Sequence, residues 1–232
     1  MVVSIKFAAE LRDKLHGLNL FKPEHLQFYQ EMALAFIKGN ENEILQIYKD
    51  IKGNKTIGIG FNMDNPEARI VWQAIFQGLI SFDKVYNGQQ TITTEQSRMI
   101  YDYKSATNRI ELKNIYGKSW DKLKPNERLM IEDLYWNGGN KLVGKFTKFF
   151  QHMRLYAESS KLKYLEQGLI EVREGSNKEK IRGIQNRRNV QSEIGDSSKC
   201  LTLLPYVGIL MIFFITTSCK IDCKLLYQNL LS

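Results

Sequence analysis

The sequence predicts an α+β fold, mostly helical, with one small antiparallel β-hairpin or sheet near residues 46–61. Apolar residues recur at helical spacing along most of the chain. One stretch departs from that spacing: DIKGNKTIGIGF (50–61) contains a Gly53-Asn54 turn signal, followed by residues that alternate in period two. Four prolines among 232 residues, and the lack of a low-complexity tract, argue against a disordered or stalk-like protein.

Helices are expected on both sides of this β unit. Residues 5–38 form two of them, because Phe21-Lys22-Pro23 interrupts the pattern and the second helix starts near Pro23. Residues 66–82 return to helical spacing. Thr93 can cap the next helix while Gln96 reaches back to it, which is a capping box. Later helices are expected at 94–114, 125–136, 142–156, 159–171 and 177–193.

The C-terminal tail differs from the rest. Residues 201–219 carry no charge and are flanked by Lys199 and Lys220. A helix rises about 1.5 Å per residue, so this stretch just spans a hydrocarbon core of roughly 30 Å. We favour a membrane anchor here; a buried helix and an unselected extension after a shifted reading frame remain alternatives. The N-terminus carries charges among its apolar residues and is not a classical secretory signal.

Charge and composition limit the partners and cofactors. The net charge of +8 favours anionic partners, namely nucleic acid, acidic membrane or bacterial wall polymers. The basic residues are scattered, and the densest run, 178–188, indicates a solvated helix, so we expect no nucleic-acid binding. The three cysteines all follow residue 199 without CxxC spacing, and the three histidines lack ligand spacing. No glycine loop could cradle a phosphate. We therefore expect neither a metal nor a cofactor.

Two carboxylates and a threonine around the β unit are the candidate catalytic residues. Glu41, Asp50 and Thr56 follow the spacing E-x8-D-x5-T. Cleavage of a glycosidic bond needs a carboxylic acid to protonate the leaving oxygen, and a second group on the other face of the sugar. Two carboxylates nine residues apart are common by chance, so the pair alone is a weak signal.

The surrounding sequence is more specific. The segment IYKDIKGNKTIGIGF (47–61) resembles the catalytic segment of the phage-type (T4-type) lysozymes nearly residue for residue. The resemblance implies that Glu41 is the general acid and that Asp50 orients a water or stabilises the transition state. It implies that Thr56 helps to hold that water. Gly58, Gly60 and Phe61 would then border the sugar.

The resemblance covers about residues 33–196 and has departures. The family has glycine directly after the catalytic glutamate, whereas this chain has Asn42, so Glu43 is a rival acid. Phe61 stands where histidine is frequent. Trp136-Asn137-Gly138-Gly139 resembles the family's Phe-Asn-x-Gly segment, so Asn137 either faces sugar or is a surface residue. The run 183–188 resembles the closing helix, and we interpret its arginines as a solvated face.

The resemblance predicts three parts: an N-terminal helical extension (1–32), a lysozyme-like domain (33–196) and the hydrophobic tail (197–232). The predicted activity is that of a bacteriolytic muramidase, a monomer acting on peptidoglycan. It would be an endolysin, or a lysozyme acquired by another virus or a eukaryote, and either membrane-anchored or soluble in the host cell before lysis. The alternative is a catalytically silent module with the same fold that binds peptidoglycan.

Overall fold

The computed structural model describes residues 3–177 and 182–201 and confirms the α+β class. The chain divides into two compact units after Ser197. The first unit contains helices and one three-stranded antiparallel sheet of order β1-β2-β3. Only α11 (Ser198–Leu201) is described in the second. The predicted anchor at 201–219 therefore lies outside the described residues apart from Leu201, and none of the described helices is long and apolar enough to cross a membrane.

The elements follow the predicted order with shifted boundaries, but the single helix expected at 142–156 is two helices separated at Phe146. The strands are β1 (Ile44–Lys49), β2 (Lys55–Gly58) and β3 (Phe61–Asn62). The helices before α6 are α1 (Ile5–His16), α2 (Pro23–Glu41), α3 (Ala68–Phe76), α4 (Phe82–Tyr86) and α5 (Thr94–Tyr116), followed by the 3₁₀ helix η1 (Gly117–Lys122). The later helices are α6 (Pro125–Trp136), α7 (Gly139–Lys145), α8 (Thr147–Ser159), α9 (Leu162–Asn177) and α10 (Arg182–Gly195).

Local signals explain where the main helices begin. Pro23 occupies the first position of α2, where its missing N–H costs nothing. The capping box at α5 is formed as predicted: the backbone N–H of Gln96 donates to Thr93 Oγ1, and the backbone N–H of Thr93 donates to Gln96 Oε1. The expected helix at 66–82 is instead two helices, because α3 ends with Gln77 in a left-handed conformation and Ser81 caps α4.

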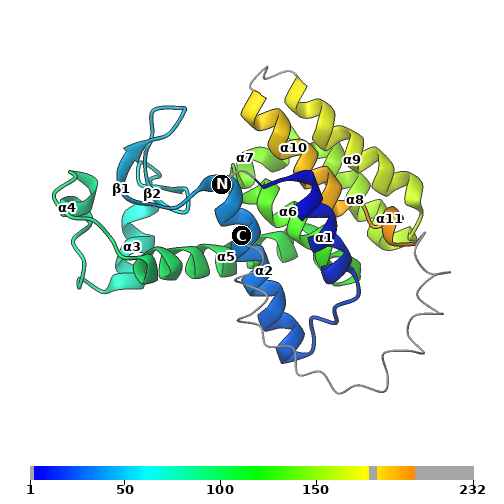
Figure 1. The fold of residues 1–232 in the computed structure, drawn as a ribbon, viewed down its shortest axis with the longest axis horizontal. Coiled ribbons are helices and arrows are strands. Elements are labelled where there is room, and N and C mark those ends of the chain that lie inside the picture. Colours follow the sequence, from blue (N-terminus) through cyan, green and yellow to red (C-terminus); the bar gives the residue numbers. More distant parts are fainter. Residues whose placement is uncertain (1–2, 178–181, 202–232) are drawn as a thin grey trace. The chain divides into compact units, whose positions relative to one another are not determined.

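The hydrophobic core forms two clusters, and α5 contributes to both. Ile100 belongs to the smaller cluster, which joins the sheet to α3 and α4. Tyr101, Leu112 and Tyr116 belong to the larger cluster, among the remaining helices. In Figure 1 the sheet, α3 and α4 lie toward one end of α5, whereas α6 and the helices around it lie toward the other. The chain thus has a small lobe and a large lobe connected by α5.

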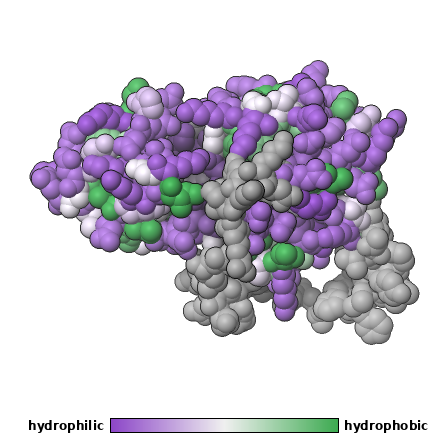
Figure 2. Space-filling model, turned by 90° about the horizontal axis from the view of Figure 1, so that it is seen from above, coloured by the Kyte–Doolittle hydropathy of each residue, from purple (hydrophilic) through white to green (hydrophobic). Residues whose placement is uncertain are grey.

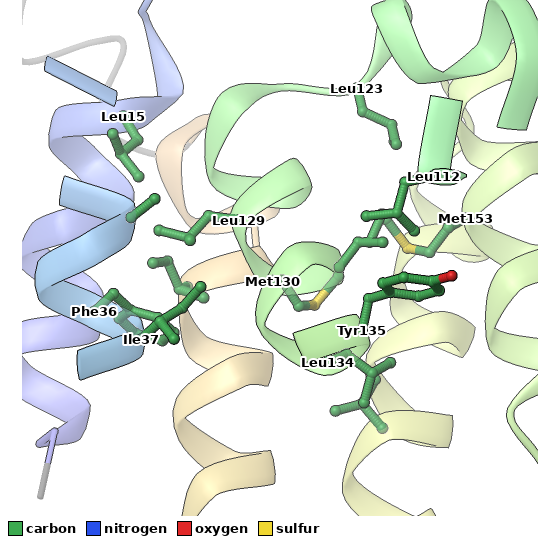
Figure 3. Packing of buried hydrophobic residues seen from close by; sticks show 14 of the residues in the cluster. Leu15, Phe36, Ile37, Leu112, Leu123, Leu129, Met130, Leu134, Tyr135 and Met153 are labelled. Carbon is green, nitrogen blue, oxygen red and sulfur yellow. The ribbon is translucent and has the colours of Figure 1, made fainter. Parts of the chain in front are cut away.

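Helix α6 is the centre of the large lobe. From Pro125 to Tyr135 every residue except Arg128 is buried, because α1, α2, α5, α7 and α10 all pack against it. Figure 3 shows the side chains that meet there: Leu15, Phe36, Ile37, Leu112, Leu129, Met130, Leu134, Tyr135 and Met153. Any charged residue on α6 must consequently find its partner inside the protein.

Helix α1 packs on α10 and α6 within the first unit. Its buried side chains Ala8, Leu11 and Leu15 belong to the large cluster, and Arg12 pairs with Glu193 of α10 at 2.6 Å. Figure 2 shows a face on which hydrophilic residues predominate and hydrophobic ones are scattered. The predicted division of this part of the chain into an N-terminal extension (1–32) and a domain (33–196) remains a prediction.

Candidate active site

Glu41 is the last residue of α2, and its carboxyl group lies against the turn between β2 and β3. A Cβ atom on Gly60 would be only 3.2 Å from both Cδ and Oε2 of Glu41. Gly60 also has a φ of +73°, in the region that favours glycine. The sequence motif therefore has a structural reason: a glycine backbone is needed for the turn to approach the Glu41 carboxyl group this closely.

Arg187 of α10 fixes the Glu41 carboxyl group from the other side. Its Nη1 donates to Glu41 Oε1 at 2.6 Å, and its Nη2 donates to Asp133 Oδ1 of α6, also at 2.6 Å. The Arg187 side chain is 13% exposed and that of Asp133 is fully buried. Burial alone would lower the pKa of Arg187, but Asp133 and Glu41 raise it above the ordinary arginine value. Arg187 is therefore a permanent cation beside Glu41.

The prediction of a solvated helix was wrong for the two arginines. Arg187 is mostly buried, and Arg188 is 6% exposed, with its Nη1 bonded to Gln191 Oε1 at 2.6 Å. The reason is that α10 packs against α1, α6 and α9, so little of it faces solvent. A signal was present in the sequence, since Arg187 precedes the buried Val190 and Ile194 by three and seven residues and shares their helix face.

Asp50 follows β1 directly, and the hairpin turn holds its carboxyl group. Oδ1 accepts the backbone N–H groups of Lys52 and Asn54 at 2.8 and 2.9 Å, and Oδ2 accepts Asn54 Nδ2 at 3.0 Å. Partial burial opposes ionisation, but these hydrogen bonds outweigh it and lower the pKa of Asp50. Asp50 is thus a fixed carboxylate over a wide pH range.

Tyr48 connects the three predicted catalytic residues. It pairs with Thr56 across β1 and β2, so the two side chains are on the same face of the sheet. Burial raises the pKa of Tyr48, and the charges of Glu41 and Asp50 raise it further, so both carboxyl groups act electrostatically on its hydroxyl. The fold therefore brings Glu41, Asp50 and Thr56 to one region, around the half-buried Tyr48.

Thr56 itself is only 3% exposed. Its hydroxyl donates to the backbone carbonyl of Asn54 at 3.2 Å. The lone pairs of Oγ1 are left as acceptors, so any water bonded to this hydroxyl would donate to it.

One comparison with known proteins identifies the family. The probable T4-type lysozyme 2 of Dictyostelium discoideum is 30% identical to this chain over 120 residues, which span 48% of this chain and 68% of that protein. The chain belongs to the T4-type lysozyme family. A search of protein-family models found no match.

Membership of the T4-type lysozymes leaves the choice between Glu41 and Glu43 to the geometry. Glu43 Oε2 pairs with Lys38 Nζ at 2.6 Å, and the Glu43 side chain is 13% exposed. The Glu41 carboxyl group lies against the turn at Gly60, and its charge raises the pKa of Tyr48. These contacts favour Glu41 over Glu43 as the candidate site residue.

The other residues predicted to border the sugar are placed differently. Phe61 pairs with Ile57 on the opposite face of the sheet from Thr56, is 7% exposed, and lies 6.4 Å from Trp72 between ring centroids. A Cβ on Gly58 would meet Ser97 Oγ of α5 at 2.9 Å. Phe61 and Gly58 thus pack inside the small lobe, whereas Gly60 adjoins Glu41.

Asn137 is the C-cap residue of α6, and its Nδ2 donates to the backbone carbonyl of Asp133 at 2.6 Å. This bond ends the helix and orients the amide group, which remains partly exposed. A sugar contact by the Asn137 Oδ1 atom stays a prediction. The residues that we did not predict as part of the site are Tyr48, Asp133 and Arg187.

Proposed function

We propose that this chain is a muramidase, which hydrolyses the β-1,4 bond between N-acetylmuramic acid and N-acetylglucosamine in peptidoglycan. Membership of the lysozyme family supports the substrate class. The observation that carries the proposal is the placement of Glu41, whose carboxyl group is held between Gly60 and Arg187 at the end of α2. A general acid must be positioned within hydrogen-bond reach of the oxygen that it protonates, and these contacts fix its position.

The proposed reaction begins with proton transfer from Glu41 to the leaving glycosidic oxygen. As the bond breaks, positive charge develops on the sugar ring, and the fixed carboxylate of Asp50 stabilises it. Because the Asp50 carboxylate is already oriented by Lys52 and Asn54, it needs little reorganisation as that charge appears.

Water then attacks the anomeric carbon from the opposite face of the ring and its released proton passes to the Asp50 carboxylate. The anomeric centre is thereby inverted. We assign the orientation of this water to Asp50 and Thr56. The Thr56 hydroxyl donates to Asn54, so it can only accept a hydrogen bond from the water. A water that donates to both groups has its oxygen lone pair free to attack the sugar.

Matched substitutions of the two neighbouring glutamates test the assignment. We expect Glu41→Gln to lower the rate of clearing in wall-loaded gels by about 10²–10⁴-fold, the usual contribution of a general acid. Glu43→Gln keeps a side chain of the same shape two residues away and should retain the rate within a few-fold. Full clearing by Glu41→Gln would refute the assignment. A wild-type chain that is retained on purified walls but never clears them would instead indicate a binding module.

A further inference from the structure

A second buried acid shares Arg187 with Glu41. Asp133 accepts Arg187 Nη2 at 2.6 Å and Nε at 3.2 Å, so the guanidinium group contacts both carboxylate oxygens. Gln191 Nε2 also donates to Asp133 Oδ2 at 2.6 Å. Each Asp133 oxygen therefore faces donors alone, which is the environment of an ionised carboxylate. The chain of contacts runs from Glu41 through Arg187 to Asp133.

Arg187 alone would disfavour protonation of an adjacent general acid. An arginine within hydrogen-bond distance stabilises the ionised form of a carboxyl group, whereas the acid must hold a proton until it meets the substrate. Arg188 is a second cation, within electrostatic range of Arg187 and Asp133. Burial and the charge of Arg187 lower its pKa to about 10, which leaves it charged at neutral pH. Without a counter-charge, Arg187 would favour the deprotonated state of Glu41.

We propose that Asp133 is a positioning residue that balances the charge of Arg187, so that Arg187 fixes the Glu41 carboxyl group without preventing its protonation. The carboxylate of Asp133 is fully buried, so it cannot reach substrate. It acts only through Arg187. This inference rests on the proposed role of Glu41 as the general acid.

The other groups around Glu41 do not supply this balance. From the sheet, Tyr48 is neutral over the working pH range because its pKa is raised, and Asp50 bonds to its own turn. On α2, Lys38 pairs with Glu43. Within the part of the chain that the structure describes, Asp133 of α6 is the other carboxylate that forms an ion pair with Arg187.

The direct test is an NMR titration of the Glu41 side chain in the full-length chain with ¹³C-labelled carboxyl groups, assigned with Glu41→Gln. We expect Asp133→Asn to move the Glu41 titration, and with it the alkaline limb of the wall-clearing profile, to lower pH by about one unit. Glu132→Gln is the matched control, since Glu132 is the adjacent buried acid on α6 and pairs with Arg109 at 3.0 Å. The control should leave the titration unchanged.

A double variant tests the route through Arg187. Arg187→Gln should move the Glu41 titration to higher pH. A buried carboxyl group that has lost its cation is held protonated, so adding Asp133→Asn to Arg187→Gln should produce no downward shift. An unshifted titration in Asp133→Asn, an equal shift in Glu132→Gln, or a downward shift that persists without Arg187 would each overturn the proposal. If Asp133→Asn does not fold, the wild-type chain still decides the matter: an Asp133 carboxyl group that takes up a proton before Glu41 does would contradict it.

The titration needs no catalysis, so the two proposals can fail separately. A shifted Glu41 titration in a chain that never clears walls supports the charge balance and contradicts the muramidase. An unshifted titration in a chain that clears walls through Glu41 contradicts the charge balance alone.

Discussion

Gly60→Ala should impair catalysis more than it impairs folding. The added methyl group would lie 3.2 Å from Cδ and Oε2 of Glu41. The Glu41 carboxyl group is already bonded to Arg187 at 2.6 Å, so moving it by a few tenths of an ångström strains that ion pair. A left-handed conformation costs a non-glycine residue about 1–2 kcal/mol. Misplacing a catalytic group can cost about 10²-fold in rate, and we expect a 10–100-fold loss of wall-clearing rate.

Gly78→Ala separates the two effects. Gly78 has a φ of +87° and no atom within 4 Å of the position where a Cβ would lie, so its substitution imposes backbone strain without touching Glu41. Both variants should lose about 1–2 kcal/mol in the free energy of unfolding, measured by urea denaturation. Only Gly60→Ala should lose activity beyond two-fold. Equal activity in the two variants would refute the idea that Gly60 matters through Glu41.

Two further predictions concern pH dependence and the small lobe. Asn54→Ala removes the 3.0 Å hydrogen bond to Asp50 Oδ2, so the pKa of Asp50 should rise. The acid limb of the activity profile should then move to higher pH, and an unmoved limb would contradict the role of Asp50. Trp72→Ala should cost about 3–5 kcal/mol in the free energy of unfolding, because Trp72 is 2% exposed and donates to the Ile80 carbonyl at 2.9 Å. In Leu79→Ala, at a residue 89% exposed, the change should stay within about 0.5 kcal/mol.

Much of the fold could be predicted because its signals are local. The proline at the start of α2 and the capping box of α5 act within one turn, and both helices begin at the expected residues. The division of residues 66–82 into two helices could not be predicted from periodicity. This division depends on the left-handed conformation of Gln77. The spacing of apolar residues contains no signal for that conformation.

The candidate site likewise contains residues that a local motif predicts and residues that tertiary packing brings in. Asp50 and Thr56 belong to one hairpin, so their motif is continuous in sequence. Arg187, which contacts Glu41, lies 146 positions after it in the sequence. Asp133, which contacts Arg187, lies more than 90 positions after Glu41. Charged residues on a helix usually face solvent. The helical spacing of Arg187 with Val190 and Ile194 indicates burial, but the pairing of Arg187 with Asp133 depends on the packing of α10 against α6. Phe61 was predicted near sugar from its place in the motif, but the alternation of the strand turns it into the core.

The most direct test of the central claim is the identity of the reducing ends released from purified peptidoglycan, determined by mass spectrometry after digestion with the full-length chain and with Glu41→Gln. A muramidase that uses Glu41 should release products ending in N-acetylmuramic acid, and Glu41→Gln should release essentially none. Products ending in N-acetylglucosamine, or equal release by Glu41→Gln, would contradict the account.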